Sequence, residues 1–291
     1  MGKKEEYYLE NIMHFFIRSS SETNRITYLI ILLSICLLIA GATATTTQLH
    51  IARYASDGTT LLNETTVDYQ WMEAKLPVYG DGIIHYYHQG PVFIDDPDQG
   101  AEEILRWNSA EDVNVQEKDM GAVKGTSVRD LVDLVGGMEP GDTVTIRADD
   151  GFSKTFAYRN VYIPLGRQGP MVITWYREDE GYVPDYTTGM RLVFFSDTST
   201  NPWGIHAFGN WDWHESADPE YYYYYMQGGE RFPTTTGLSV QMVSSLDIRE
   251  GAHITPPDAT TPTPKIPLSI LTIFFGIIGG VWIILSKGVP Q

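Results

Sequence analysis

Four of the seven histidines stand in two short aromatic segments, and imidazole is the most common metal-binding side chain in proteins. The first segment reads GIIHYYHQG and the second reads GIHAFGNWDWHE, in which an aspartate stands two residues before the last histidine. Histidine nitrogen together with carboxylate oxygen suits zinc, copper or iron. The predicted metal-ligating set is therefore His85, His88, His206, Asp212 and His214, with Glu215 next in sequence.

The spacing inside each segment indicates which of these side chains can face the same way. His85 and His88 are three apart, which suits one face of a helix but opposite faces of a strand, and the neighbouring glycines disfavour a helix. Residues 210–215 are expected to be extended, with Asp212 and His214 on one face and two tryptophans on the other. The competing interpretation is that the histidines satisfy hydrogen bonds at the end of a tryptophan-rich core.

Aromatic residues are dense around the second histidine segment. Trp203, Trp211, Trp213 and the five tyrosines of residues 221–225 all lie within this short stretch. Such a cluster could line a concave pocket for sugar or quinone-like rings, or form an interaction surface. The alternative is that the aromatic side chains pack a β core, with the tyrosine run as its most exposed part.

Cysteine usage and the absence of known catalytic motifs exclude several classes of enzyme. Cys36 is the only cysteine, and it lies in a long apolar run, so the rest of the chain offers no disulfide, thiolate ligand or cysteine nucleophile. No P-loop, G-x-G-x-x-G, H-E-x-x-H, G-x-S-x-G or C-x-x-C-H motif occurs. We predict no catalytic residue, and nucleotide hydrolysis, zinc proteolysis, lipase chemistry and c-type haem binding are disfavoured.

The central part of the chain alternates short β-type runs with turn residues. Strands are expected at 143–147, 171–176 and 190–195. One clear helix is expected at 127–135, because its apolar residues fall on one face, Ser127 can cap its start and two glycines follow it. The predicted fold class is a strand-rich α+β domain.

Four motifs in this region resemble one known family. The sequences GTSVRDLVDLVGG, TVTIRADDGFSKTF, MVITWY and GMRLVFF occur in that order, and together they resemble the molybdopterin-binding fold of the sulfite oxidase family. Asp150, Gly151 and Phe152 match its S-x-D-G-Y element, and residues 189–193 match G-x-P-L-R-L-V. The likeness places a molybdopterin-binding-like core at 120–200. The wider domain is similar to predicted surface proteins of methane-producing archaea.

The resemblance implies a cofactor chemistry that this sequence does not support. In catalytic members of the family a cysteine thiolate binds the molybdenum, and the only cysteine here is Cys36. We therefore expect a non-catalytic domain with no cofactor. Two alternatives remain open: a metal-handling or redox accessory protein that uses the histidine and aspartate cluster to hold a transition metal, and a pterin-dependent oxidoreductase.

Two uncharged apolar runs, at 26–44 and 266–285, are each long enough to cross a bilayer. They predict transmembrane helices at 26–45 and 266–286. Most cations near the first run precede it, which predicts a cytoplasmic N-terminus. These cations are Lys3, Lys4, Arg18 and Arg25 before the run, against Arg53 after it, and Lys287 follows the second run. The rival interpretation of the first run is a signal peptide cleaved near Ala44.

This topology places residues 1–25 and 287–291 in the cytoplasm and one domain, at 46–253, outside the cell. A linker rich in proline and threonine follows at 254–265. Residues 45–264 carry 33 acidic against 14 basic residues, a charge that repels nucleic acid. Asn63 begins an N-glycosylation sequon.

The expected partners are the membrane itself and proteins within or near it. Gly276 and Gly280 form a G-x-x-x-G spacing in the second run, which allows close approach of another helix. That helix could belong to a second copy of the chain or to the first run, and the spacing also occurs by chance. The functional prediction is a membrane-anchored extracytoplasmic binding protein or component of an envelope complex.

Overall fold

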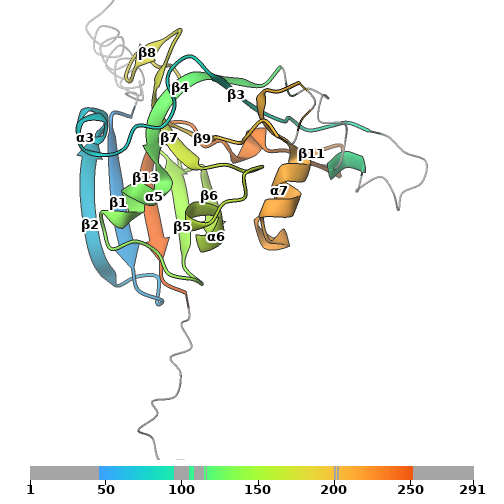
Figure 1. Ribbon diagram of the computed structural model, residues 1–291. Helices are drawn as coiled ribbons and strands as arrows, with labels where there is room; N and C mark the ends of the chain where they lie inside the picture. Colours follow the sequence, from blue (N-terminus) through green and yellow to red (C-terminus); the bar gives the residue numbers. More distant parts are fainter. Residues whose placement is uncertain are drawn as a thin grey trace, which may run out of the picture. The chain divides into compact units, whose positions relative to one another are not determined.

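The computed structural model describes residues 46–94, 105–107, 115, 117–199, 201 and 203–251, which fold as one strand-rich α+β domain with mixed sheets (Figure 1). The predicted fold class is thus confirmed. The two predicted membrane spans, the cytoplasmic segments and the linker at 254–265 lie outside the described residues. Within the part of the chain that is described, no helix has both the length and the apolar character needed to cross a bilayer.

The first sheet brings the two ends of the domain together at its centre. Strand β13 lies between β1 and β5, and it pairs parallel with β1, so that His50 faces Ser245. The remaining pairs of this sheet are antiparallel. In spatial order the strands are β2 (Leu61–Asp68), β1 (Gln48–Tyr54), β13 (Val243–Arg249), β5 (Thr143–Ala148) and β6 (Ser153–Ala157).

The second sheet contains the strands formed by MVITWY and GMRLVFF and the strands that carry His85, His88 and His206. Its path is β10 (His206–Phe208), β3 (His85–His88), β4 (Asp119–Ser127), β7 (Met171–Arg177) and β8 (Gly181–Tyr182), and β9 (Arg191–Phe194) also pairs with β7. Strands β10 and β3 are parallel, whereas the other pairs are antiparallel. A separate hairpin consists of β11 (Tyr224–Gln227) and β12 (Glu230–Pro233).

Short helices cover and connect the sheets. They are α3 (Tyr69–Lys75), α5 (Val128–Asp133), α6 (Tyr158–Tyr162) and α7 (Asn210–Ser216), with single 3-10 turns η1 (Pro219–Tyr221) and η2 (Thr236–Leu238). Helix α5 starts as predicted, because the Ser127 hydroxyl accepts the Asp130 N–H at 3.1 Å. The helix ends at Asp133, two residues before the predicted end, and Gly136 and Gly137 follow with positive φ angles of 106° and 75°.

One large core joins both sheets and α5. Apolar side chains of β1, β5 and β13 belong to the same buried cluster as those of β7, β9 and α5. Aromatic rings fill its centre, and Phe194 stacks on Phe208 with 4.4 Å between ring centroids. The largest fully buried side chains are Trp175, Trp213, Tyr186, Phe156, Phe194 and Phe208.

The parallel pairing of β1 and β13 gives the domain two distinct ends. The chain starts β1 beside α3, where the Tyr69 N–H donates to the Thr47 carbonyl at 3.3 Å. It leaves β13 at the opposite end, where the Gly251 N–H donates to Asp142 at 2.9 Å. Figure 1 shows α3 and β8 at the upper end of this sheet and the end of β13 at the lower one.

Candidate functional site

The five side chains predicted as metal ligands lie in different environments rather than in one site. Among the described residues, no group of three or more histidine, cysteine, aspartate or glutamate side chains is placed to hold a metal ion. His85 and His88 lie in β3 with opposite exposure, as the strand interpretation of their spacing predicted: His85 is exposed and His88 is fully buried. Each of the five therefore has its own structural explanation.

His88 is a buried neutral imidazole in the aromatic core. Its Nε2 accepts the Phe194 N–H at 3.2 Å, and its ring meets those of Phe194 and Phe208 edge to face. Burial lowers the pKa of His88 to about 3, and the nearby charge of Arg191 acts in the same direction. At neutral pH the ring therefore carries no charge and serves as a hydrogen-bonding core residue.

The prediction that residues 210–215 are extended is wrong, because this segment forms helix α7. The Asp212 carboxylate accepts the Gly209 N–H at 2.8 Å, which satisfies a backbone donor at the helix start. Asp212 is buried, and its other oxygen lies 3.9 Å from Arg167. In a helix, side chains two residues apart point in different directions, so Asp212 and His214 do not share a face.

His214 and His206 are engaged by aromatic rings and backbone oxygen. His214 stacks on Trp211, one turn earlier in α7, with 4.5 Å between centroids. His206 places its Nδ1 2.6 Å from the Ser196 carbonyl, and its ring tilts against Tyr86. Glu215, the next residue in sequence, lies 3.2 Å from His214, and among the residues that the structure describes this pair is not completed to a metal-binding group.

The aromatic residues near His214 pack on one another. Trp107 contacts His214, Tyr222 and Tyr224 with centroid distances of 5.3, 4.6 and 5.5 Å. The tyrosine run was predicted to be the most exposed part of this aromatic cluster. Of its five tyrosines only Tyr225 is exposed, and the other four are half-buried.

A shallow cleft of about 310 Å³ lies elsewhere, between β2, α3 and α5, and includes Trp71 and Leu134 in its lining.

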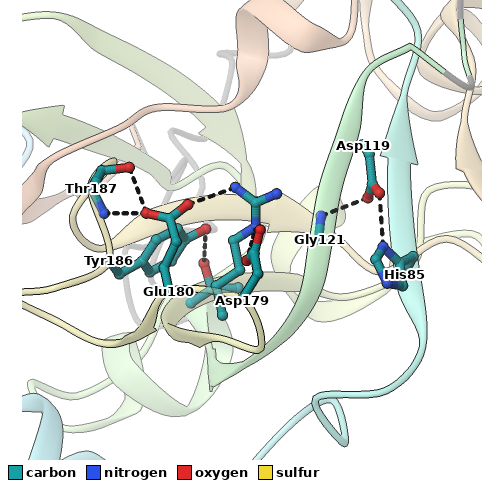
Figure 2. A network of polar contacts seen from close by, with 9 residues as sticks. His85, Asp119, Gly121, Asp179, Glu180, Tyr186 and Thr187 are labelled. Carbon is teal, nitrogen blue, oxygen red and sulfur yellow. Dashed lines mark hydrogen bonds and ion pairs between the residues drawn. The ribbon is translucent and has the colours of Figure 1, made fainter.

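One polar network brings a predicted site residue together with residues that the sequence did not single out (Figure 2). His85 Nδ1 lies 2.8 Å from Asp119 Oδ2, and Asp119 Oδ1 accepts the Gly121 N–H at 2.7 Å. A carboxylate in this position fixes the orientation of the imidazole. One imidazole with one carboxylate falls short of the ligand set of a typical protein metal site. No sequence signal indicated Asp119, because its proximity depends on the pairing of β3 with β4.

A second part of the network, also in Figure 2, surrounds the β7–β8 turn. Arg177 binds Asp179 at 3.0 Å and Glu180 at 2.8 Å, and Glu180 also accepts the Thr187 N–H at 2.6 Å. Burial alone would raise the pKa of Glu180, but hydrogen bonds from Thr187 and the charge of Arg177 hold this pKa below its ordinary value. Because the Asp179 and Glu180 carboxylates are already paired with donors of this chain, we interpret the turn as a structural element and not as a binding site.

The clearest surface with binding character lies at the β11–β12 hairpin. We name Phe93, Tyr225 and Met226 the hairpin patch. Phe93 is 56% exposed and Met226 62% exposed, and the Phe93 ring meets Tyr225 at 6.2 Å and the buried Phe232 at 4.7 Å. Beside the patch, the Arg106 guanidinium lies 4.2 Å from the Phe232 ring centroid and pairs with Glu230 at 2.6 Å. Aromatic residues, methionine and arginine are enriched in protein interfaces.

Neither a protein-family model nor a curated protein sequence matches this chain.

Proposed function

We propose that this protein is a membrane-anchored, extracytoplasmic binding protein that contributes its domain to an envelope or membrane protein complex. The observation that carries this proposal is the hairpin patch, where Phe93, Tyr225 and Met226 remain exposed although they border a buried aromatic residue. Exposed apolar side chains grouped in this way mark interaction surfaces. The two apolar runs of the sequence support the membrane anchorage, and their flanking cations support placement of the domain outside the cell.

The composition of the patch favours a protein partner. Phe93 and Tyr225 offer rigid apolar area with few rotatable bonds, and methionine adapts its shape to a facing surface. The Arg106–Glu230 pair lies at the margin of the patch, where it can contribute polar contacts around an apolar centre. A strongly acidic domain does not attract nucleic acid, so we infer a protein in or near the same membrane.

We further propose that the domain is a degenerate member of the sulfite-oxidase-type molybdopterin-binding fold. The support is the order of its elements, since α5, β5, the turn at Asp150, β6, β7 and β9 follow one another as the matching motifs do. The residues present do not fit the cofactor, because the domain contains no cysteine to act as the thiolate ligand. A role in binding rather than oxidation follows from that mismatch.

A photo-cross-linking experiment in native cells tests the binding proposal. A photoreactive amino acid replaces Met226 in the full-length chain, and the same residue replaces Leu62 as a control, because Leu62 is an exposed apolar residue on β2. We expect one discrete cross-linked membrane protein from position 226 and none from position 62. The substitutions Phe93→Ser and Tyr225→Ser should reduce that product, whereas Thr59→Ser should not.

Two results would count against the proposed function. Equal cross-linking from both positions would remove the hairpin patch as a specific surface, and recovery of the chain in the soluble fraction would remove the membrane anchorage. Elemental analysis and pterin release on the detergent-purified full chain test the degenerate fold. Stoichiometric molybdenum or tungsten with pterin would contradict a non-catalytic domain, and stoichiometric zinc or copper would favour the metal-handling alternative.

A further inference from the structure

One end of the domain combines closeness to the first apolar run with exposed aromatic and aliphatic side chains. Residue 45 alone separates the run at 26–44 from Thr46, and an extended residue spans only about 3.5 Å. If the run crosses the membrane, Thr46 lies within the headgroup zone or directly against it, since that zone is only about 5–7 Å thick on each side. The end of the domain near Thr46 must then face the lipid.

A continuous series of contacts connects Thr46 with the other residues of this end. The neighbouring Thr47 carbonyl accepts the Tyr69 N–H, and the Tyr69 ring lies 5.6 Å from that of Tyr182. Tyr182 in turn meets Tyr176 at 4.9 Å, and Gly82 lies against Tyr176 and Lys124. Figure 1 shows α3, β8 and the loop after α3 together at this end of the first sheet.

Several exposed side chains at this end are of the types found where proteins meet membrane interfaces. Ile83 is 77% exposed, which is high for a large aliphatic residue, and the Asp81 carboxylate fixes its backbone by accepting the Ile83 and Ile84 N–H groups at 2.8 Å. Tryptophan and tyrosine concentrate at the headgroup level of bilayers. We define the juxtamembrane surface as the exposed Trp71, Val78, Ile83, Ile84 and Tyr182 together with the half-buried Tyr69.

Two carboxylates at this end are paired with donors of the domain, and one lysine lies over an aromatic ring. Asp68 accepts the Trp71 N–H at 2.7 Å and Glu73 accepts the Tyr182 hydroxyl at 2.8 Å, so these carboxylates are engaged by donors of the domain itself. The Lys124 ammonium lies 5.0 Å from the Tyr176 ring centroid and adds a cation. Lysine beside aromatic rings is a common arrangement at bilayer interfaces.

We propose that the juxtamembrane surface rests in the headgroup region of the membrane that anchors the chain, which sets the orientation of the domain. This inference rests on the membrane anchorage in the proposed function. The opposite end, with Gly251, then points away from the bilayer by about 23 Å, the length of β13. The 14 residues between Gly251 and the second run can extend about 43 Å, so the second anchor is compatible with this orientation.

Fluorescence quenching in nanodiscs tests the orientation. In a full-length Cys36→Ser background, a single cysteine replaces Ile83 at the juxtamembrane surface or Ser56 in the β1–β2 turn at the other end, and each is labelled with an environment-sensitive dye. The nanodiscs contain phosphatidylcholine with and without a nitroxide-labelled headgroup. We expect quenching at position 83 to exceed that at position 56 by about threefold or more, because the two ends differ by about 20 Å in height.

The possible outcomes separate this inference from the proposed function. A chain that resists alkaline carbonate extraction but shows equal or weaker quenching at position 83 overturns the orientation and leaves the anchorage intact. A chain that carbonate extracts overturns both. Circular dichroism identical to that of the unlabelled chain confirms that each cysteine variant is folded.

Discussion

The Asn210 side chain accepts the backbone N–H of Thr235 at 3.0 Å, in a position where neither residue is exposed to solvent. The Asn210 amide also donates to the Gly90 carbonyl at 3.2 Å and the Pro233 carbonyl at 3.0 Å. The Thr235 hydroxyl donates to the Phe208 carbonyl, close to the same site, at 2.6 Å. One amide at the first turn of α7 thus connects three segments that are distant in sequence.

Replacing Asn210 by alanine should destabilise the domain strongly. The substitution removes three hydrogen bonds from a buried site, and each buried polar group that loses a partner costs about 1–3 kcal/mol. We expect the free energy of unfolding to fall by about 3 kcal/mol in urea denaturation of the domain. The control Gln70→Ala changes an exposed amide and should shift it by less than about 0.5 kcal/mol. Similar losses for both variants would show that the Asn210 contacts contribute little.

The stability of the domain should fall as the pH drops below about 6.5. The unfolded His88 takes up a proton near pH 6.5, whereas folded His88 resists protonation until its pKa of about 3. Because the unfolded state binds more protons between these values, folding is favoured above this window and weakened as the pH falls through it. This one residue should lower the free energy of unfolding by about 1.4 kcal/mol per pH unit within the window.

Comparison with His88→Gln isolates that effect. Glutamine can still offer an acceptor to the Phe194 N–H but does not titrate, so its stability between pH 6 and 4 should change less steeply than that of the wild type. Urea denaturation at several pH values measures both slopes. Parallel slopes would mean that His88 is protonated as readily in the fold as in the unfolded chain.

Arg53 should be important for joining the first and last strands of the domain. It pairs with Glu250 at 3.0 Å, lies 3.8 Å from Asp142 and donates to the Gly136 carbonyl at 2.9 Å. Arg53→Ala leaves the buried Asp142 without this cation, and we expect a loss of about 2–3 kcal/mol in the free energy of unfolding. Arg249→Ala, at an exposed position of the same sheet, should cost less than about 0.5 kcal/mol.

Lys154 should react with acylating reagents at lower pH than the other lysines. Partial burial lowers its pKa to about 8, and its ammonium lies 3.4 Å from the Tyr223 ring centroid. The neutral amine is the nucleophile, so the rate of acetylation at Lys154, followed by mass spectrometry, should rise with a midpoint near pH 8. The acetylation of Lys118 in the same samples serves as the internal reference for reagent reactivity. Coincident profiles would contradict the shifted pKa.

Local sequence signals predicted the elements whose formation depends on local contacts. Ser127 and the glycine pair defined α5, and β-branched runs defined β5 and β7, because capping and strand preference act within a few residues. Helix α7 was missed although Asp212 stands three residues after Gly209, a spacing that suits an N-terminal cap. The alternation of Trp211 and Trp213 suits a strand equally well, so the local pattern alone does not distinguish the two conformations.

The candidate site was less predictable, because it depends on strand pairing. His85 reaches Asp119 only through the alignment of β3 with β4, which is fixed by the core and not by either segment alone. The four histidines of the two aromatic segments are close in sequence within each segment, which suggested a shared site. In the fold each of these side chains lies in a separate environment. The exposure of Phe93 and Met226 also depends on how the hairpin packs, so the hairpin patch had no signal in the sequence.

The central position of β13 has a consequence for how the protein is made. Arg53 and Glu250, partners across β1 and the end of β13, are 197 residues apart, so β1 has to remain without its parallel neighbour until nearly the whole domain has been synthesised. Contacts between such distant segments form slowly, and an unpaired apolar strand is prone to aggregation in the meantime. A chain terminated before Val243 would lack the strand that joins β1 to β5, and synthesis of its last residues is therefore the step that permits the first sheet to close.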